Sequence, residues 1–588
     1  MGRATTGALA GLALAVAAAA AAPAASPAAA AVVRGDRGRR LDEYMSRLDA
    51  LGYSGGLAVV KGGETVLLKG YGRRDRERGV PMGPDSVFNL GSITKSFTAA
   101  AVLRLQEAGK LETSDLVSRF FAGVPEDKTG ITLEHLLTHS SGLESDFSPT
   151  DYEATTREEY VRRALASKLL FPPGQGYAYS NAGYSLLAAI VEQETGKDYE
   201  TALGELVLKP AGLVETGYKA PRWDPARVAH GYEDGEDWGT ILARIEDPAA
   251  PFWALRGNGG LHTTLADMVR WDAALRSDTL FSAAARESWF RPRVAEGPGA
   301  ESHYAFGWAV EQTPHGTLVQ HNGGNGIYVA ELLRYVDAGV TLFLASTVAE
   351  MKATPVVPAL ARIAFGEPVD LPPAVAALSP DALRARAGRY RGASGAEVRL
   401  TARDGGLAAE ATEPLGFALL AGTPASERER YARLDARTAD IAGRAFKGDP
   451  TGLHEALGGR RGLEEIREQE AELMRDREQR LGPYRGYAVV GSAPYGGDRV
   501  ETTVRVDFER RSVYNRFLWG PKDALVGRRA GPEPPGARYV PLSERDFVAF
   551  RLGGGPSLAP PLRFEGDGDA PVLVVAGPDG PVRLHRVP

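Results

Sequence analysis

The chain has 588 residues, which is too long for a single hydrophobic core, so we expect two to four domains. A composition of 43% hydrophobic and 24% charged residues is typical of an ordinary globular protein. The net charge of -6 leaves no basic footprint for nucleic acid or for an anionic membrane surface. Cysteine is absent, which excludes disulfides, thiol catalysis and zinc–thiolate sites.

The N-terminal segment has the order of a secretory signal. One arginine precedes an apolar run from Ala8 to about Ala22, and prolines and small residues follow. This order predicts a signal peptide over residues 1–31 and a secreted or periplasmic protein. An uncleaved membrane anchor is the alternative. No other segment reaches the roughly 18 apolar residues that a span requires, so no membrane span is expected in the mature form.

Residues 36–366 have the pattern of an α+β domain. Residues 35–50 carry apolar side chains at helical spacing, and residues 55–71 form two β-rich runs joined by Lys61-Gly62-Gly63, which predicts a hairpin. Residues 131–275 are mostly helical, and residues 304–348 return to strands. We therefore predict an antiparallel sheet built from both ends of the domain, flanked by helices, with a helical lobe between them.

A different pattern begins after a proline-rich linker at residues 367–380. Short strands are predicted near the two ends of residues 381–588, and charged helices between them. This order predicts a mainly β C-terminal region with an α+β insertion at about 425–530.

The segment Gly91-Ser92-Ile93-Thr94-Lys95 opens a predicted helix that ends near Gly109. Ser92 would lie at the helix N-terminus, where unpaired N–H groups and the dipole favour negative charge. Lys95 is three residues away, on the same helix face, and could act as a base if burial disfavours its charged form. The alternative is a capping serine and a solvated lysine, and this segment alone leaves both open.

Three other segments contain polar residues that suggest chemistry. Tyr179-Ser180-Asn181 precedes a predicted helix, and His321-Asn322-Gly323 lies on or beside a predicted strand. Residues 52–56 match the pattern Gly-x-Ser-x-Gly around Ser54. That motif needs a strand before the serine and a helix after it, and here the order is reversed, so Ser54 is predicted to be a loop residue.

The segments that contain Ser92 and Lys95, Tyr179 to Asn181, and His321 to Gly323 together resemble the three-motif active site of the serine β-lactamase and penicillin-binding-protein superfamily. More narrowly, they resemble the class C β-lactamase-related serine hydrolases, which include D-alanyl-D-alanine carboxypeptidases, D-amino-acid peptidases and esterases. The resemblance covers about residues 40–365. It is carried, in chain order, by residues 88–99, 131–143, 171–196, 257–271 and 304–328. Residues 378–392 and the end of the chain resemble the lipocalin-like β-domain that often follows such hydrolases.

The resemblance implies a role for each motif residue. Ser92 would be the acylated nucleophile, and Lys95 and Tyr179 would handle its proton, with either as the base. Asn181 would bind the substrate amide or orient Lys95. The N–H groups of Ser92 and Gly324 would form the oxyanion hole. Tyr179 as a merely buried tyrosine and Asn181 as a helix cap are the alternatives, and no metal or cofactor is implied.

The third motif departs from its usual form, because many members of the superfamily have Lys-Thr-Gly where this chain has His321-Asn322-Gly323. An imidazole is mostly neutral at pH 7, so the permanent cation that would pair with a substrate carboxylate is missing. The alternative to a substrate-binding role is that His321 only shapes the strand end. We therefore predict hydrolysis of a small-molecule or peptide substrate, an ester or a D-amino-acid peptide, with weak or no β-lactamase activity. A peptide derived from peptidoglycan is one candidate.

Two further predictions complete the set. The counterpart of His139 in the family is usually structural, so His139 is not expected to be the base. The rival to an enzyme is a catalytically silent penicillin-binding-like protein that acts as a binding or scaffold module of the cell envelope. The oligomeric state is not predicted.

Overall fold

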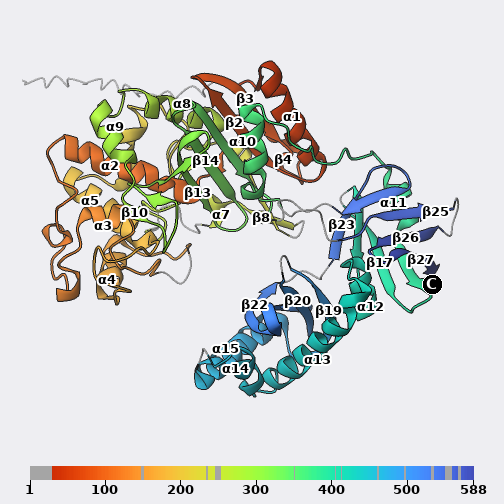
Figure 1. Ribbon diagram of the computed structural model, residues 1–588. Helices are drawn as coiled ribbons and strands as arrows, with labels where there is room; N and C mark the ends of the chain where they lie inside the picture. Colours follow the sequence, from red (N-terminus) through yellow and green to blue (C-terminus); the bar gives the residue numbers. More distant parts are fainter. Residues whose placement is uncertain are drawn as a thin grey trace, which may run out of the picture.

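The computed structural model describes residues 29–147, 151–233, 236–244, 253–349, 351–403, 405–411, 413–459, 462–495, 498–531, 536–549, 559–566 and 571–588. Figure 1 shows an N-terminal domain, a barrel, and a helix–sheet unit that projects from the barrel. The predicted signal peptide lies almost wholly outside the described residues, which begin at residue 29.

A nine-stranded antiparallel sheet is the centre of the N-terminal domain. The two ends of the domain join through the pairing of β2 with β15, in which Val59 faces Leu342. The prediction of a sheet built from both ends is therefore confirmed. In sheet order the strands are β1 (Val32–Val33), β3 (Glu64–Tyr71), β2 (Gly55–Lys61), β15 (Val340–Ser346), β14 (Val329–Tyr335), β13 (Gly316–Gly324), β12 (Ala309–Thr313), β11 (His303–Tyr304) and β10 (Val294–Ala295).

Both faces of this sheet are covered, so its central strands are apolar on both sides. Leu57 and Val59 of β2 pack against α1 (Gly35–Ala50) and α10 (Val357–Phe365). Ala58, between them, points to the opposite face, where it joins the core of the helical lobe. This alternation follows from the two-residue period of a strand and places the sheet between two helical layers (Figure 1).

The helical lobe surrounds α2, which is buried along most of its length. Ala99, Ala100 and Ala101 are small enough to let neighbouring helices approach α2 closely. The helices of this part are α2 (Thr94–Glu107), α3 (Leu133–Leu137), α4 (Arg157–Ala166), α5 (Asn181–Thr195), α6 (Tyr199–Leu203), α7 (Ile241–Arg244), α8 (Leu265–Arg276) and α9 (Ala283–Phe290).

Three short strand pairs complete this domain. They are β4 (Arg73–Asp75) with β5 (Val80–Pro81), β6 (Phe88–Asn89) with β9 (His262–Thr263), and β7 (Gly231–Glu233) with β8 (Glu236–Gly239).

The C-terminal region contains a closed barrel of eight strands, preceded by α11 (Pro380–Arg386). The barrel interior is apolar, as the buried side chains of Leu407, Phe547 and Leu573 illustrate. The strands are β16 (Gly388–Gly392), β17 (Glu397–Arg403), β18 (Gly406–Glu410), β23 (Gly536–Pro541), β24 (Asp546–Ala549), β25 (Leu562–Glu565), β26 (Val572–Gly577) and β27 (Gly580–Val587).

An α+β unit is inserted between β18 and β23 of the barrel. Its four-stranded antiparallel sheet packs against helices around a separate apolar core. The elements are α13 (Arg428–Ala445), α14 (Thr451–Ala456), α15 (Leu463–Leu481), β19 (Tyr484–Pro494), β20 (Val500–Phe508), β21 (Ser512–Trp519) and β22 (Leu525–Gly531). The helix before them, α12 (Pro414–Leu420), contributes Leu420 to the barrel core. The predicted fold class is confirmed in both halves of the chain.

The barrel packs against the N-terminal domain next to α1. Arg538 of β23 donates a hydrogen bond from Nη1 to the carbonyl oxygen of Leu51, 2.6 Å away. Val540, two residues further along β23, joins the apolar cluster that includes Leu41 and Leu57. Within the described ranges, no helix is both long enough and apolar enough to cross a bilayer.

Candidate active site

Ser92 lies in a single 3-10 turn, Gly91–Ile93, between β6 and α2. The residue before it has to be glycine. Gly91 has a φ of +49°, and a Cβ there would lie 2.3 Å from the backbone nitrogen of Gly324. The Asn89 side chain accepts a hydrogen bond from the Gly91 N–H, which fixes this turn. Ser92 itself stays partly exposed, so a ligand can reach its hydroxyl.

Lys95 is fully buried at the start of α2. Its Nζ lies 3.0 Å from Ser92 Oγ, 2.8 Å from Asn181 Oδ1 and 2.8 Å from the carbonyl oxygen of Asn258. Burial lowers the pKa of Lys95 well below its ordinary value of 10.5, although the negative charges of Asp146 and Asp151 oppose this shift.

The three contacts of Lys95 fit the three N–H groups of an ammonium, and they fit equally the neutral amine, which is the form that burial favours. Two of the partners, Asn181 Oδ1 and the Asn258 carbonyl, can only accept hydrogen bonds. A neutral amine has two N–H groups for them and one lone pair, which is left for the Ser92 hydroxyl. This geometry allows Lys95 to take the proton of Ser92.

Tyr179 and Asn181 approach this pair from the start of α5. The cap of α5 is Ser180, whose Oγ accepts a hydrogen bond from the Gly183 N–H at 3.1 Å, so Asn181 does not serve as the cap. The Tyr179 ring centroid lies 4.7 Å from Lys95 Nζ. Burial raises the pKa of the Tyr179 phenol, and the nearby Ser92 side chain opposes that shift.

The end of β13 closes the site from the sheet side. A Cβ at Gly323 would lie 2.5 Å from the backbone nitrogen of Ser92 and 2.1 Å from the carbonyl oxygen of Leu90. Only glycine permits so close an approach of two backbones. The structure therefore brings Gly323 and Gly324 against the turn that carries Ser92, where the resemblance had placed an oxyanion hole.

His321 is buried behind this strand end and is held at both ring nitrogens. Its Nδ1 lies 2.6 Å from the Asn322 carbonyl oxygen, which can only accept, so Nδ1 carries the proton. Its Nε2 then accepts a hydrogen bond from the Tyr304 hydroxyl at 2.8 Å. Burial, with the charge of Lys95, lowers the pKa of His321 to about 3, so the ring is neutral near pH 7.

The sequence model of the Beta-lactamase family matches residues 39–365. This chain belongs to the Beta-lactamase family. It is 30% identical over 337 residues to Penicillin-binding protein 4* of Bacillus subtilis (strain 168), a match that covers 54% of this chain and 74% of that relative. A structure of the octameric penicillin-binding protein homologue from Pyrococcus abyssi aligns with a TM-score of 0.50 at 18% identity. That alignment covers 93% of this chain and 99% of the other, and it shows a shared fold.

Two residues of this Beta-lactamase family site were missed from the sequence, Asn258 and Tyr304. Asn258 lies in the glycine-rich run 257–260, and its Nδ2 donates to Ser185 Oγ and to the Ala254 carbonyl oxygen. A Cβ at Gly257 would lie 2.5 Å from the Tyr184 carbonyl oxygen. The run of glycines was a visible sign of close backbone packing, but nothing in it marked a carbonyl for Lys95.

Ser54 is buried where α1 leads into β2, and its Oγ accepts a hydrogen bond from the Arg73 N–H. The reversed order of helix and strand is confirmed, so Ser54 is not part of a nucleophile elbow.

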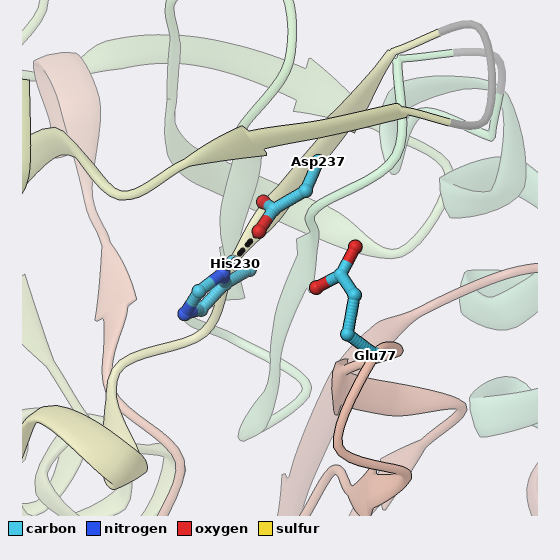
Figure 2. Close-up of side chains that lie close together, drawn as sticks. All are labelled: Glu77, His230 and Asp237. Atoms are coloured by element: carbon cyan, nitrogen blue, oxygen red, sulfur yellow. Dashed lines mark hydrogen bonds and ion pairs between the residues drawn. The ribbon is translucent and has the colours of Figure 1, made fainter.

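A second polar group lies on elements that supply none of the predicted site residues. Figure 2 shows Glu77, His230 and Asp237 around a common space, with their ligand-type atoms within 4.8 Å of one another. His230 Nδ1 and Asp237 Oδ2 are 2.9 Å apart, and this pair ties the residue before β7 to β8. The three residues could hold a cation, and two of them are exposed to solvent.

Proposed function

We propose that this chain is an exported serine hydrolase that forms an acyl-enzyme on Ser92 and hydrolyses ester or D-amino-acid amide and peptide substrates. The observation that carries the proposal is the fully buried Lys95, whose Nζ lies 3.0 Å from Ser92 Oγ and is held there by Asn181 and Asn258. A buried lysine without a carboxylate partner is costly, and proton transfer gives that arrangement a purpose.

In the acylation step, Lys95 takes the hydroxyl proton as Ser92 Oγ bonds to the substrate carbonyl carbon. The bond to the leaving group then breaks, Tyr179 passes its phenol proton to the departing oxygen or nitrogen, and the proton that Lys95 took from Ser92 restores the phenol, so both side chains return to their starting state. Water completes the cycle by hydrolysing the ester on Ser92. The N–H groups of Ser92 and Gly324 would bind the carbonyl oxygen as it becomes negative, which is typically worth several kcal/mol.

The neutral His321 narrows the substrate class. It offers no positive charge to a substrate carboxylate, and its two nitrogens are already occupied by Tyr304 and Asn322. We therefore expect weak or no β-lactamase turnover. Because the Bacillus subtilis relative is named a penicillin-binding protein, slow covalent labelling by penicillin and a substrate derived from peptidoglycan are both part of the proposal.

Export and the role of the C-terminal region are also proposals. Removal of residues 1–31 would leave a chain that begins next to β1 (Val32–Val33). The eight-stranded barrel, which we infer to be lipocalin-like, would serve as a wall or binding module beside the hydrolase domain.

The test is a panel of p-nitrophenyl esters, D-amino-acid amides and the β-lactam nitrocefin. We expect turnover of at least one ester or amide, and nitrocefin turnover well below it. Nitrocefin turnover equal to the best ester or amide would contradict the substrate assignment. Absence of turnover with every compound, together with absence of covalent labelling, would favour the silent binding protein.

A further inference from the structure

His139 follows α3 in an unusual conformation. Its φ is +58°, in the left-handed region that residues with a side chain seldom adopt. The residue is fully buried, so the surrounding contacts must hold it there. Strained backbone of this kind is concentrated at functional sites.

Those contacts bracket Tyr179. The carbonyl oxygen of His139 accepts a hydrogen bond from the Ala178 N–H at 2.9 Å. Its side-chain Nδ1 accepts a second one from the Ser180 N–H at 3.0 Å. Ala178 and Ser180 are the two neighbours of Tyr179, so one residue fixes the backbone on both sides of the phenol. The backbone carbonyl and the side chain of His139 thus contact the same extended segment before α5.

The imidazole ring also packs on the phenol itself. The ring centroids of His139 and Tyr179 are 4.2 Å apart, and those of His139 and Tyr304 are 4.4 Å apart. Tyr304 in turn donates to His321. His139 therefore lies between the tyrosine of the second motif and the aromatic support of the third.

His139 is not arranged to move protons. Because Nδ1 accepts from an amide N–H, the single proton of the neutral ring is on Nε2. Burial lowers the pKa of His139 well below 6.5, and the nearby Lys95 and His321 add to the shift. The ring is therefore neutral near pH 7, and its contribution is geometric.

We propose that His139 is a positioning residue for Tyr179: it holds the phenol at Ser92 through two hydrogen bonds to the flanking backbone and through ring packing. The inference rests on the proposed function, since it assigns the positioned phenol a part in proton transfer. A misplacement of about 1 Å can cost about 100-fold in rate, so a single support of this kind is enough to be visible in kcat.

The experiment compares His139→Ala with His139→Asn, using p-nitrophenyl butyrate as the probe and active-site titration to count working enzyme. Asn keeps an acceptor where Nδ1 stood and tolerates a left-handed φ, whereas Ala keeps neither advantage. We expect His139→Ala to lower kcat by about 100-fold with KM changed less than threefold. In His139→Asn, the decrease in log kcat should be smaller than in His139→Ala by at least a third.

Tyr53→Phe is the matched control. It removes a different buried side-chain-to-backbone hydrogen bond from the same domain, the one that the Tyr53 hydroxyl donates to the Ala345 carbonyl oxygen. It should lower the melting temperature and leave kcat per titrated site unchanged. His139 variants that melt lower but keep the wild-type kcat per site would overturn the inference and leave the proposed function intact. A wild-type protein that forms no acyl-enzyme at all would instead overturn the proposed function.

Discussion

The N-terminal domain and the C-terminal barrel are both built on antiparallel strands, but their interiors contain different side chains. The N-terminal domain buries Lys95, His139 and the Asp272–Arg334 ion pair. Among the described residues of the eight barrel strands, the buried side chains are apolar or aromatic, as in Leu407 and Phe564. The same strand pairing thus encloses two kinds of core.

The difference is informative because burying an ionisable group is costly unless it is paired or used. Arg334 is paired with Asp272, at 3.3 Å, so its burial needs no further explanation. Lys95 has no carboxylate within ion-pair distance in the described part of the chain and instead contacts Ser92 and two acceptors. Catalysis is therefore expected at the site of Lys95, a buried ionisable group without an ion-pair partner among the described residues. The apolar core of the barrel is expected to contribute only stability.

The largest effect is expected from Ser92→Ala. Without the nucleophile, hydrolysis of p-nitrophenyl esters should fall at least about 1,000-fold, leaving only what binding and the oxyanion site provide. Initial rates on the best ester measure this loss. Ser54→Ala, which removes the hydroxyl of the other candidate serine, a buried one, is the control and should keep the wild-type rate. Equal activity of both variants would mean that the comparison assigns chemistry to the wrong serine.

The next effect is that of Lys95→Met, which keeps the length of the side chain and removes its amine. We expect kcat to fall by about 100- to 10,000-fold, the range of general base catalysis. The control is Lys69→Met, because Lys69 of β3 forms an ordinary ion pair with Asp42 of α1. Steady-state kinetics with both proteins decide the matter: a Lys95→Met variant within threefold of wild type would reduce Lys95 to a structural residue.

His321 gives a smaller, pH-dependent effect on stability. The pKa of His321 is depressed to about 3 in the fold and is about 6.5 when unfolded, so the unfolded state binds the proton first as pH falls. Its stabilising contribution is complete above pH 6.5 and is lost between 6.5 and 3, by at most about 1.4 kcal/mol per pH unit. Urea unfolding from pH 7 to 4 should show wild type losing stability relative to His321→Gln.

The matched control for this effect is His585→Gln, in the barrel. His585 is exposed on β27, so its environment changes little on unfolding. The free energy of unfolding of His585→Gln should therefore depend on pH in the same way as that of wild type. If that of His321→Gln does so as well, the ring is not held neutral by the fold.

The smallest effect on catalysis is expected from the barrel. Phe547→Ala empties a fully buried position and should lower the free energy of unfolding of this region by about 3–5 kcal/mol. Ester hydrolysis per titrated Ser92 should remain unchanged. Phe97→Ala in α2, two residues after Lys95 and stacked on Trp271 at 4.2 Å, should lower both stability and rate. A rate loss in Phe547→Ala would show that the barrel contributes to the site.

Much of the fold was predictable because local patterns were unambiguous. The hairpin at Lys61-Gly62-Gly63 is confirmed, since β2 ends at Lys61 and β3 begins at Glu64, with both glycines at positive φ. The helix predicted after Ser92 is confirmed as α2, and Gly109 follows its end at a φ of +65°. Gly91 gave the clearest local signal of a special backbone, although the single 3-10 turn around Ser92 was not predicted.

The rest of the site depended on tertiary contacts that no local pattern reports. Tyr304 of β11 donates to His321 of β13 past the intervening strand β12, and the Asn258 carbonyl reaches Lys95 from a loop more than 160 residues away. The sequence also left open whether Asn181 is the helix cap or a site residue, because Ser180 and Asn181 are both good capping residues. The structure decides it, since Ser180 caps α5 and Asn181 faces Lys95.

The central claim is that Ser92 is the nucleophile, and covalent labelling tests it most directly. The full-length protein is treated with a fluorophosphonate probe, and the modified peptide is identified by mass spectrometry. We predict one adduct per chain, on Ser92, which is absent in Ser92→Ala and forms at least about 100 times more slowly in Lys95→Met. No adduct, or an adduct on Ser54 or another serine with Ser92 unmodified, would contradict the account.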